Sequence, residues 1–200
     1  RPTGKITDIF FLAAALDGPS SYINLVQTVQ LAASGADISF AAPLTSRGVV
    51  PKGVIAFQDL VTIYKFENEL YLVEMTGQQV KDYLEYSYDN WVNRRGPSYN
   101  WDSADGILYE VSRSAPAGDR VKILSMKDGS PFDPAKTYKV AMTSYRANGG
   151  GDLLTEGAGI DPTQMKVLEK YKDIRSIIGD YIAGQEEIVP EVSTNWKFVK

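Results

Sequence analysis

Apolar residues recur at helical spacing in two stretches of the chain, and this spacing predicts two helices. The first covers residues 22–31, with Ser20 or Ser21 as its N-cap and Gly35 as the residue that ends it. The second covers residues 78–91. The buried face predicted for this helix carries Val80, Tyr83, Leu84 and Ser87.

Short apolar runs and alternating segments, bounded by turn residues, predict several strands. They are residues 36–41, 69–75, 107–111, 121–126 and 137–142. A polar, aromatic loop is expected over 90–105, a helical region over 164–183 with a break near 172–173, and an extended tail over 189–200. This mixture predicts an α+β fold with a mixed β-sheet and flanking helices. Two hundred residues suffice for one domain or two very small ones, and a single domain over 1–200 is the simpler organisation.

Composition narrows the possible ligands. Hydrophobic residues make up 44% and charged residues 23% of the chain, so a buried core is expected. The net charge of −4 argues against binding to nucleic-acid polymers, which need a basic surface. A mononucleotide needs only one or two local cations and stays compatible with this charge. The longest apolar run, Ile9–Leu16, is too short to span a membrane.

The chain contains no histidine and no cysteine. Their absence rules out a Ser-His-Asp triad, a cysteine nucleophile and a thiolate zinc site. Asp and Glu can hold Mg²⁺ or Ca²⁺, but no clustered carboxylates with ligand spacing occur in the sequence. We therefore expect no cofactor in this chain, and we expect it not to perform chemistry by itself.

Four segments, in a fixed order, carry a resemblance to a known family. They are SGADISFAAPL at 34–44; PKGVI at 51–55 with YKFENEL at 64–70 and MTG at 75–77; YNWD at 99–102 with Asp105-Gly106; and TYKVA at 137–141 with YRANGGG at 145–151. Together they resemble the C-terminal domain of the 5'-nucleotidase / 2',3'-cyclic-nucleotide 2'-phosphodiesterase family. The 41–44 segment, Ala-Ala-Pro-Leu, and the Tyr-Arg-Ala before the glycines are closer to the cyclic phosphodiesterase branch.

The resemblance implies a division of labour between two domains. In this family an N-terminal metallophosphoesterase domain holds a divalent metal pair and hydrolyses the ester. The C-terminal domain clamps the base between two aromatic rings and presents the phosphate to the metals. No motif of the metal domain is found in these residues. The resemblance thus implies a substrate-binding domain for nucleosides and mononucleotides, partnered by its own N-terminal catalytic domain, in the periplasm or at the cell surface.

Residue by residue, the resemblance assigns the two stacking rings to Phe66 and Tyr145. Aromatic stacking suits any base, because every base has a π face. Tyr64 is the alternative stacking partner, since it shares a side with Phe66 if the segment is extended. Asn68 can pair with a purine edge or bond its own backbone in a turn. Either ring can also be an ordinary core residue.

The other candidates surround this presumed base pocket. Arg47 lies at the offset where the nucleotidases have a phosphate- or carboxyl-contacting arginine, or else it is a solvated loop residue. Gly149, Gly150 and Gly151 allow close backbone approach. Asp152 follows one residue after the position of the family's ribose-binding Asp. Asn100, Trp101 and Asp102 are expected either at the rim, with Trp101 exposed, or packed within the loop.

Two classes of function stay open at this point. The chain is either the specificity domain of a metal-dependent nucleotide phosphoesterase, or a non-catalytic nucleotide-binding or adhesion module at the cell surface. The preferred base, and whether the phosphoester is cyclic or open, are not determined by these residues.

Overall fold

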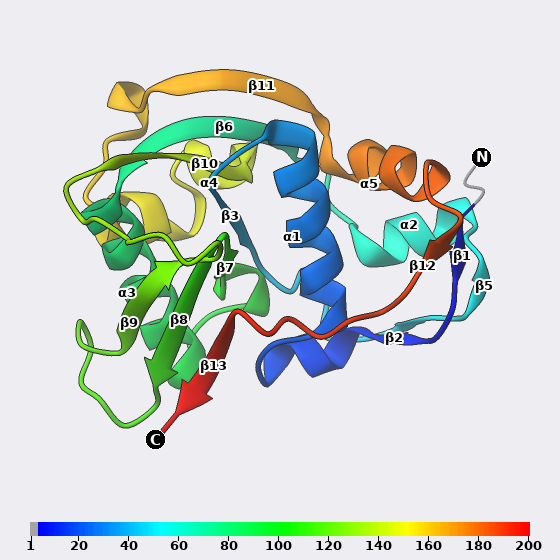
Figure 1. The fold of residues 1–200 in the computed structure, drawn as a ribbon, viewed down its shortest axis with the longest axis horizontal. Coiled ribbons are helices and arrows are strands. Elements are labelled where there is room, and N and C mark those ends of the chain that lie inside the picture. The colour runs from blue at the N-terminus through cyan, green and yellow to red at the C-terminus, as the bar shows by residue number, and fades with distance from the viewer. Residues whose placement is uncertain (1–3) are drawn as a thin grey trace.

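The computed structural model describes residues 4–200. Its centre is a five-stranded mixed sheet with the order β11-β6-β10-β3-β7 (Figure 1). The strands are β3 (Ile38–Ala41), β6 (Glu69–Thr76), β7 (Ser103–Asp105), β10 (Thr137–Thr143) and β11 (Val167–Asp173). β10 runs parallel to β3, and the other neighbouring pairs are antiparallel. The prediction of an α+β fold with a mixed sheet is confirmed.

Helices pack against this sheet. They are α1 (Ser21–Ser34), α2 (Phe57–Ile63), α3 (Gly77–Val92), the short α4 (Ser144–Ala147) and α5 (Ile174–Ala183). Because neighbouring residues in a strand point to opposite faces, β10 divides its side chains between two cores. Tyr138, Val140 and Met142 join the core that contains α3. Ala141 joins the core built from α1, α2 and α5.

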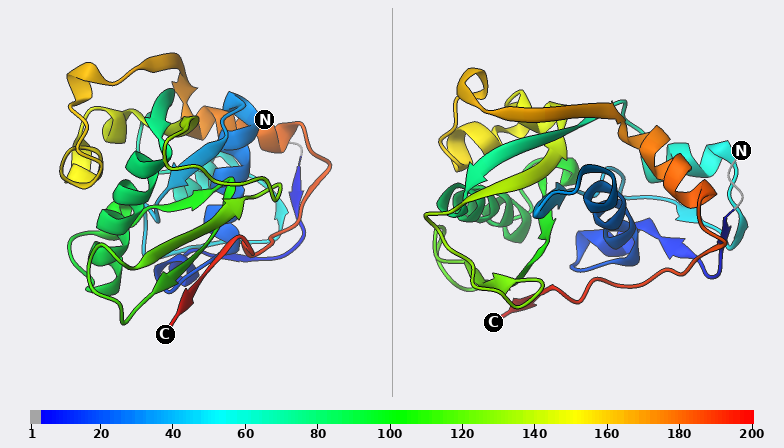
Figure 2. Two further views of the ribbon diagram at one scale, coloured as in Figure 1. Left: turned by 60° about the vertical axis from the view of Figure 1, so that its left-hand side comes forward. Right: turned by 45° about the horizontal axis from the view of Figure 1, so that its top comes forward.

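Three small sheets and several short helical turns complete the chain. One sheet, β13-β8-β9, consists of β8 (Ile107–Ser112), β9 (Val121–Met126) and β13 (Trp196–Val199). A second, β12-β1-β5, consists of β1 (Lys5–Ile6), β5 (Gly53–Val54) and β12 (Glu187–Ile188), and β2 (Phe10–Phe11) pairs with β4 (Val49–Val50). The first two lie at opposite ends of the molecule, joined by the extended C-terminal segment (Figures 1 and 2). The short turns are η1 (Leu12–Leu16), η2 (Ser98–Asn100), η3 (Gly150–Asp152), η4 (Leu153–Gly157) and η5 (Pro162–Gln164).

The capping residues and the apolar spacing in the sequence predicted the positions of α1 and α3 correctly. The Ser20 hydroxyl accepts a hydrogen bond from the Ile23 amide, and Gly35 ends α1 in the left-handed conformation with φ of 65°. Thr76 caps α3, and the face of α3 that was predicted to be buried is buried. Within residues 4–200, no helix is both long and apolar enough to cross a membrane.

Two predictions about secondary structure were wrong. Residues 167–173 form the edge strand β11 rather than the first part of a helix, because they pair with β6 in the sheet. Helix-favouring Leu, Glu and Lys in this segment are overridden by that tertiary pairing. The break near 172–173 is confirmed, since Asp173 caps α5. The expected loop over 90–105 also ends in a strand, β7, which pairs with β3.

Candidate functional site

The register of the central sheet brings four chain segments to one edge. β6 begins there and antiparallel β10 ends there, with Leu70 opposite Thr143. β3 is parallel to β10 and ends on the same side. β7 begins there, with Ser103 opposite Ala41. The residues just before β6 and β7 and just after β3 and β10 are therefore neighbours in space.

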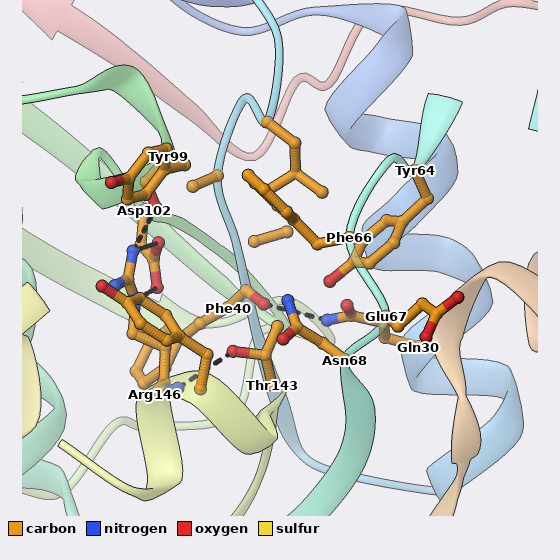
Figure 3. A pocket seen from close by; sticks show the side chains of 14 residues that line it. Gln30, Phe40, Tyr64, Phe66, Glu67, Asn68, Tyr99, Asp102, Thr143 and Arg146 are labelled. Atoms are coloured by element: carbon orange, nitrogen blue, oxygen red, sulfur yellow. Dashed lines mark hydrogen bonds and ion pairs between the residues drawn. The ribbon is translucent and has the colours of Figure 1, made fainter. Parts of the chain in front are cut away.

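A cavity of about 370 Å³ opens at this edge of the sheet (Figure 3). Its wall combines aromatic rings, small apolar residues and a few polar groups. The lining residues are Gln30, Phe40, Ala41, Ala42, Leu44, Tyr64, Phe66, Glu67, Asn68, Tyr99, Asp102, Thr143, Tyr145 and Arg146. A concave, mainly apolar site with convergent polar groups is the usual form of a small-molecule pocket.

Two partly exposed rings stand at this cavity. Phe66 is 37% and Tyr145 42% exposed. Both contact a third ring, because the Tyr99 centroid lies 5.8 Å from that of Phe66 and 6.4 Å from that of Tyr145, edge to face in each case. Phe66 and Tyr145 thus line one cavity although they lie far apart in the sequence. Their exposed surface is available to a flat, apolar ligand.

Arg146 ties together the loops that carry Tyr99 and Tyr145. Its guanidinium makes an ion pair of 2.8 Å with Asp102, and both side chains are almost fully buried. Further N–H groups donate to Asn100 Oδ1 at 2.8 Å, to the Gly150 carbonyl at 3.1 Å and to the Tyr99 carbonyl. Burial disfavours the charge of Arg146, but Asp102, Tyr83 and Tyr145 together outweigh this effect and raise the pKa of the guanidinium above its usual range. Arg146 therefore stays charged and holds several segments of the cavity wall together.

Asp102 is held from a second side. The Tyr83 hydroxyl donates to its carboxylate, and the Ser87 hydroxyl donates to its backbone carbonyl at 2.7 Å. Burial, reinforced by the neighbouring carboxylate, raises the pKa of Tyr83 well above its ordinary value. Tyr83 consequently stays a neutral donor. The ion pair is thus anchored to α3, which carries both hydroxyls.

The glycine turn after α4 packs directly against the site. A Cβ atom on Gly150 would collide with the Tyr145 ring, and one on Gly151 would collide with Asn100 and Arg146. Gly151 also has a φ of +73°, a conformation that costs a side-chain-bearing residue energy. The glycines are required here because the turn lies against Tyr145 and Arg146.

Three polar side chains converge at another part of the wall. Gln30, Tyr64 and Asn68 all line the cavity, and in the view of Figure 3 the Tyr64 hydroxyl and the two amides point toward the same region. Gln30 and Tyr64 are buried, whereas Asn68 is half-buried. Burial raises the pKa of the Tyr64 hydroxyl, an effect that nearby Asn68 partly offsets, although no hydrogen bond of normal geometry joins the two. Tyr64 therefore remains neutral.

The structure brings together four of the predicted site residues: Phe66, Tyr145, Tyr64 and Asn68 all line the cavity. Asn100, Gly150 and Gly151 support its wall through Arg146 or Tyr145. Gly149 precedes them in the turn with a φ of +93°. Of the two alternatives for Trp101, the structure shows packing within the loop and not exposure. Its ring is buried, stacks on Trp91 and donates from Nε1 to the Arg95 carbonyl at 2.8 Å.

Two further predicted residues lie outside the cavity lining. Arg47 is exposed on the loop before β4, where its backbone exchanges hydrogen bonds with the Thr45 hydroxyl. Asp152 adopts a left-handed conformation with φ of 66°. It lies near Tyr86, whose pKa is raised mainly by burial and secondly by the negative charge of Asp152. Neither residue lines the cavity.

Sequence reasoning missed several lining residues, chiefly Gln30, Tyr99 and Arg146, whereas Asp102 was among the expected rim residues and does line the cavity. A signal existed for Gln30, because an amide inside the apolar pattern of a buried helix needs a polar partner. Tyr99 and Arg146 lie within the motifs that carried the family resemblance, but their roles depend on contacts between distant loops. In the part of the chain that the structure describes, no three His, Cys, Asp or Glu side chains lie close enough to hold a metal ion.

Comparison with known proteins identifies the family to which this fold belongs. The family model for the 5'-nucleotidase C-terminal domain matches residues 2–156. The chain belongs to this family. The 5'-nucleotidase C-terminal domain fold is seen in the 5'-nucleotidase precursor from Thermus thermophilus, with a TM-score of 0.85 at 20% identity over 100% of this chain and 39% of that one. The family predicted from the four sequence motifs is therefore confirmed.

Curated relatives of this 5'-nucleotidase C-terminal domain are longer proteins. The 2',3'-cyclic-nucleotide 2'-phosphodiesterase/3'-nucleotidase of Haemophilus influenzae is 28% identical over 252 residues, covering 100% of this chain and 37% of that protein. The trifunctional nucleotide phosphoesterase protein YfkN of Bacillus subtilis is 26% identical over 178 residues, covering 74% of this chain and 11% of that protein. The chain thus spans well under half the length of these relatives.

Proposed function

We propose that this chain is the substrate-binding domain of a metal-dependent nucleotide phosphoesterase. In this proposal the cavity takes the base of a nucleoside or mononucleotide between Phe66 and Tyr145. The phosphoester then projects toward a dimetal site on an N-terminal catalytic domain. The observation that carries the proposal is the pair of partly exposed rings at one cavity, whose wall also contains a buried ion pair.

The chemistry of the cavity suits a base better than a phosphate. The Arg146 guanidinium has five N–H groups, and it makes five hydrogen bonds to protein acceptors. It is therefore committed to the wall and does not offer a cation to an anionic ligand. The remaining lining includes aromatic rings and neutral amides, which are the groups that stack on a base and pair with its edge, and the carboxylate of Glu67, which would repel a phosphate. The phosphate must be held elsewhere in this scheme, which agrees with a separate metal domain.

The names of the relatives support the same proposal. Each of the two curated relatives is named for action on nucleotide phosphoesters, and each extends well beyond the part that this chain matches. We therefore place catalysis in a further domain of the same kind of protein. A periplasmic or cell-surface location belongs to the proposal as well, as an implication of the family resemblance.

The experiment is a titration of the 200-residue chain with adenosine and with 3'-AMP, followed by NMR or calorimetry. Two stacking faces at about 1–3 kcal/mol each give roughly 2–6 kcal/mol before rigid-body freedom is lost. Because a millimolar affinity needs about 4 kcal/mol, a dissociation constant on the order of millimolar is expected. Phe66→Ala and Tyr145→Ala should each weaken adenosine binding by roughly five- to a hundredfold, while Phe66→Tyr should be nearly silent.

Phe57→Ala is the matched control, since Phe57 is an exposed ring outside this cavity. Its removal should leave adenosine binding unchanged. Arg47→Ala should likewise spare adenosine, because Arg47 lies outside the lining. If wild type and the Phe66→Ala/Tyr145→Ala double variant bind adenosine equally, the clamp assignment is wrong. If neither nucleoside nor nucleotide binds at all, an adhesion or structural role becomes the better proposal.

A further inference from the structure

The most deeply buried polar atoms of the cavity lack hydrogen-bond partners. Gln30 is 0% and Tyr64 2% exposed, in contrast to the half-exposed rings at the same cavity. Among residues 4–200, neither Gln30 Oε1 nor the Tyr64 hydroxyl has a hydrogen-bond partner. A buried polar group without a partner is costly, so two of them lining one cavity indicate a ligand that supplies the missing bonds.

The orientation of the Gln30 amide is determined by its neighbours. Its Nε2 donates to the Ser39 hydroxyl at 2.7 Å and to the Phe40 carbonyl at 2.9 Å. A carbonyl oxygen can only accept, so the NH₂ group must be the one that faces Phe40. The amide oxygen is therefore left unpaired at the cavity, where Gln30 offers an acceptor and nothing else.

Tyr64 supplies the complementary function. Because burial raises its pKa, the hydroxyl keeps its proton throughout the physiological pH range. It has no acceptor among the described residues, so it can donate to a ligand. The Tyr64 hydroxyl and the Gln30 amide lie on the same side of the cavity (Figure 3). An acceptor and a donor are thus both available on this side of the cavity.

We infer that Gln30 and Tyr64 read the edge of the base and select adenine over 6-oxo purines. This inference rests on the proposed function, because it assumes that a base enters between Phe66 and Tyr145. The amino group of adenine can donate to Gln30 Oε1, and the adjacent ring nitrogen N1 can accept from the Tyr64 hydroxyl. Asn68 can adapt to either arrangement, because its amide carries both a donor and an acceptor.

A 6-oxo purine such as hypoxanthine presents the opposite order. Its O6 accepts and its N1 donates, so O6 would face the fixed acceptor of Gln30. Stranding buried polar groups in this way typically weakens binding by roughly five- to a hundredfold. Stacking cannot offset the difference, because adenine and hypoxanthine offer the rings nearly the same π surface.

The test is a titration of the 200-residue chain with adenosine, inosine and purine riboside, which differ at positions 6 and 1 of the base. Wild type should bind adenosine roughly five- to a hundredfold more tightly than inosine, and purine riboside, which lacks the amine, more weakly than adenosine. Tyr64→Phe and Gln30→Met should each reduce this preference toward unity.

Tyr64→Phe is the sharper variant, because it removes a hydroxyl that has no partner in the fold. The melting temperature of the ligand-free variant should be unchanged or higher, while adenosine binding weakens. Tyr138→Phe is the matched control. The Tyr138 hydroxyl is buried, accepts from the Asp133 amide at 2.8 Å and lies outside the cavity. Its loss should lower the melting temperature and leave the base preference intact.

Gln27→Met is the corresponding control for Gln30→Met. Gln27 is also buried with an unpaired Oε1 but does not line the cavity. Should Gln30→Met fail to fold, the three-ligand comparison on wild type and Tyr64→Phe still decides the question. Equal binding of adenosine and inosine by wild type would overturn base-edge reading and leave the aromatic clamp standing. Failure of every nucleoside to bind would overturn the proposed function and this inference together.

Discussion

Breaking the buried ion pair between Arg146 and Asp102 should damage both the fold and the site. The two side chains are 4% and 3% exposed, so removing either partner leaves a nearly desolvated charge behind. Such removal typically costs about 3–5 kcal/mol of folding free energy. Arg146→Met should therefore lower the free energy of unfolding by about this amount, a large part of the roughly 5–15 kcal/mol available to a domain.

The same substitution should weaken adenosine binding. Arg146 donates hydrogen bonds to the Tyr99 carbonyl, the Asn100 side-chain amide and the Gly150 carbonyl. Without these bonds, the loop that carries Tyr99 and the glycine turn that packs on Tyr145 become free to move. Urea unfolding followed by tryptophan fluorescence gives the stability, and NMR titration gives the affinity. Arg120→Met is the matched control. Arg120 is a buried arginine that pairs with Asp89 at 3.3 Å outside the cavity, so stability should fall while affinity is kept.

A double-mutant cycle isolates the coupling between the two charges. Asp102→Asn alone should also be destabilising, because the guanidinium then lacks its counter-charge. The double variant Arg146→Met/Asp102→Asn should lose less than the sum of the single losses, by more than about 1 kcal/mol, because neither charge is stranded. Additive losses within about 0.5 kcal/mol would refute the reasoning, as would an equal loss of adenosine affinity in Arg120→Met.

Two further expectations concern the glycine turn and catalysis. Gly151→Ala should destabilise the chain by more than Gly129→Ala in urea unfolding. Both glycines have positive φ, but only at Gly151 would a Cβ meet Asn100 and Arg146, so equal losses would contradict the packing argument. The 200-residue chain should not hydrolyse 5'-AMP, 2',3'-cyclic AMP or bis-p-nitrophenyl phosphate with Mn²⁺, Zn²⁺ or Mg²⁺ added, because it has no histidine or cysteine. Turnover above a no-protein control that survives repurification would contradict this expectation.

Local chemistry in the sequence determined the two main helices. The serine cap and the glycine stop of α1, and the apolar face of α3, depend on residues within one or two turns of each other. Such signals need no knowledge of the rest of the chain. Residues 167–173 show where this reasoning fails, because β11 exists only through its pairing with β6, nearly a hundred residues away in the sequence.

The sequence also determined the family and the two stacking candidates, since the motifs around Phe66 and Tyr145 are contiguous and occur in the family's order. Tertiary structure alone decided what surrounds them. The parallel pairing of β10 with β3, and the antiparallel pairing of β10 with β6 and of β3 with β7, bring four distant segments to one edge. Tyr99, Arg146 and Gln30 take part in the site because of that register. A single sequence cannot reveal the register, because it depends on hydrogen bonds between strands that lie far apart along the chain.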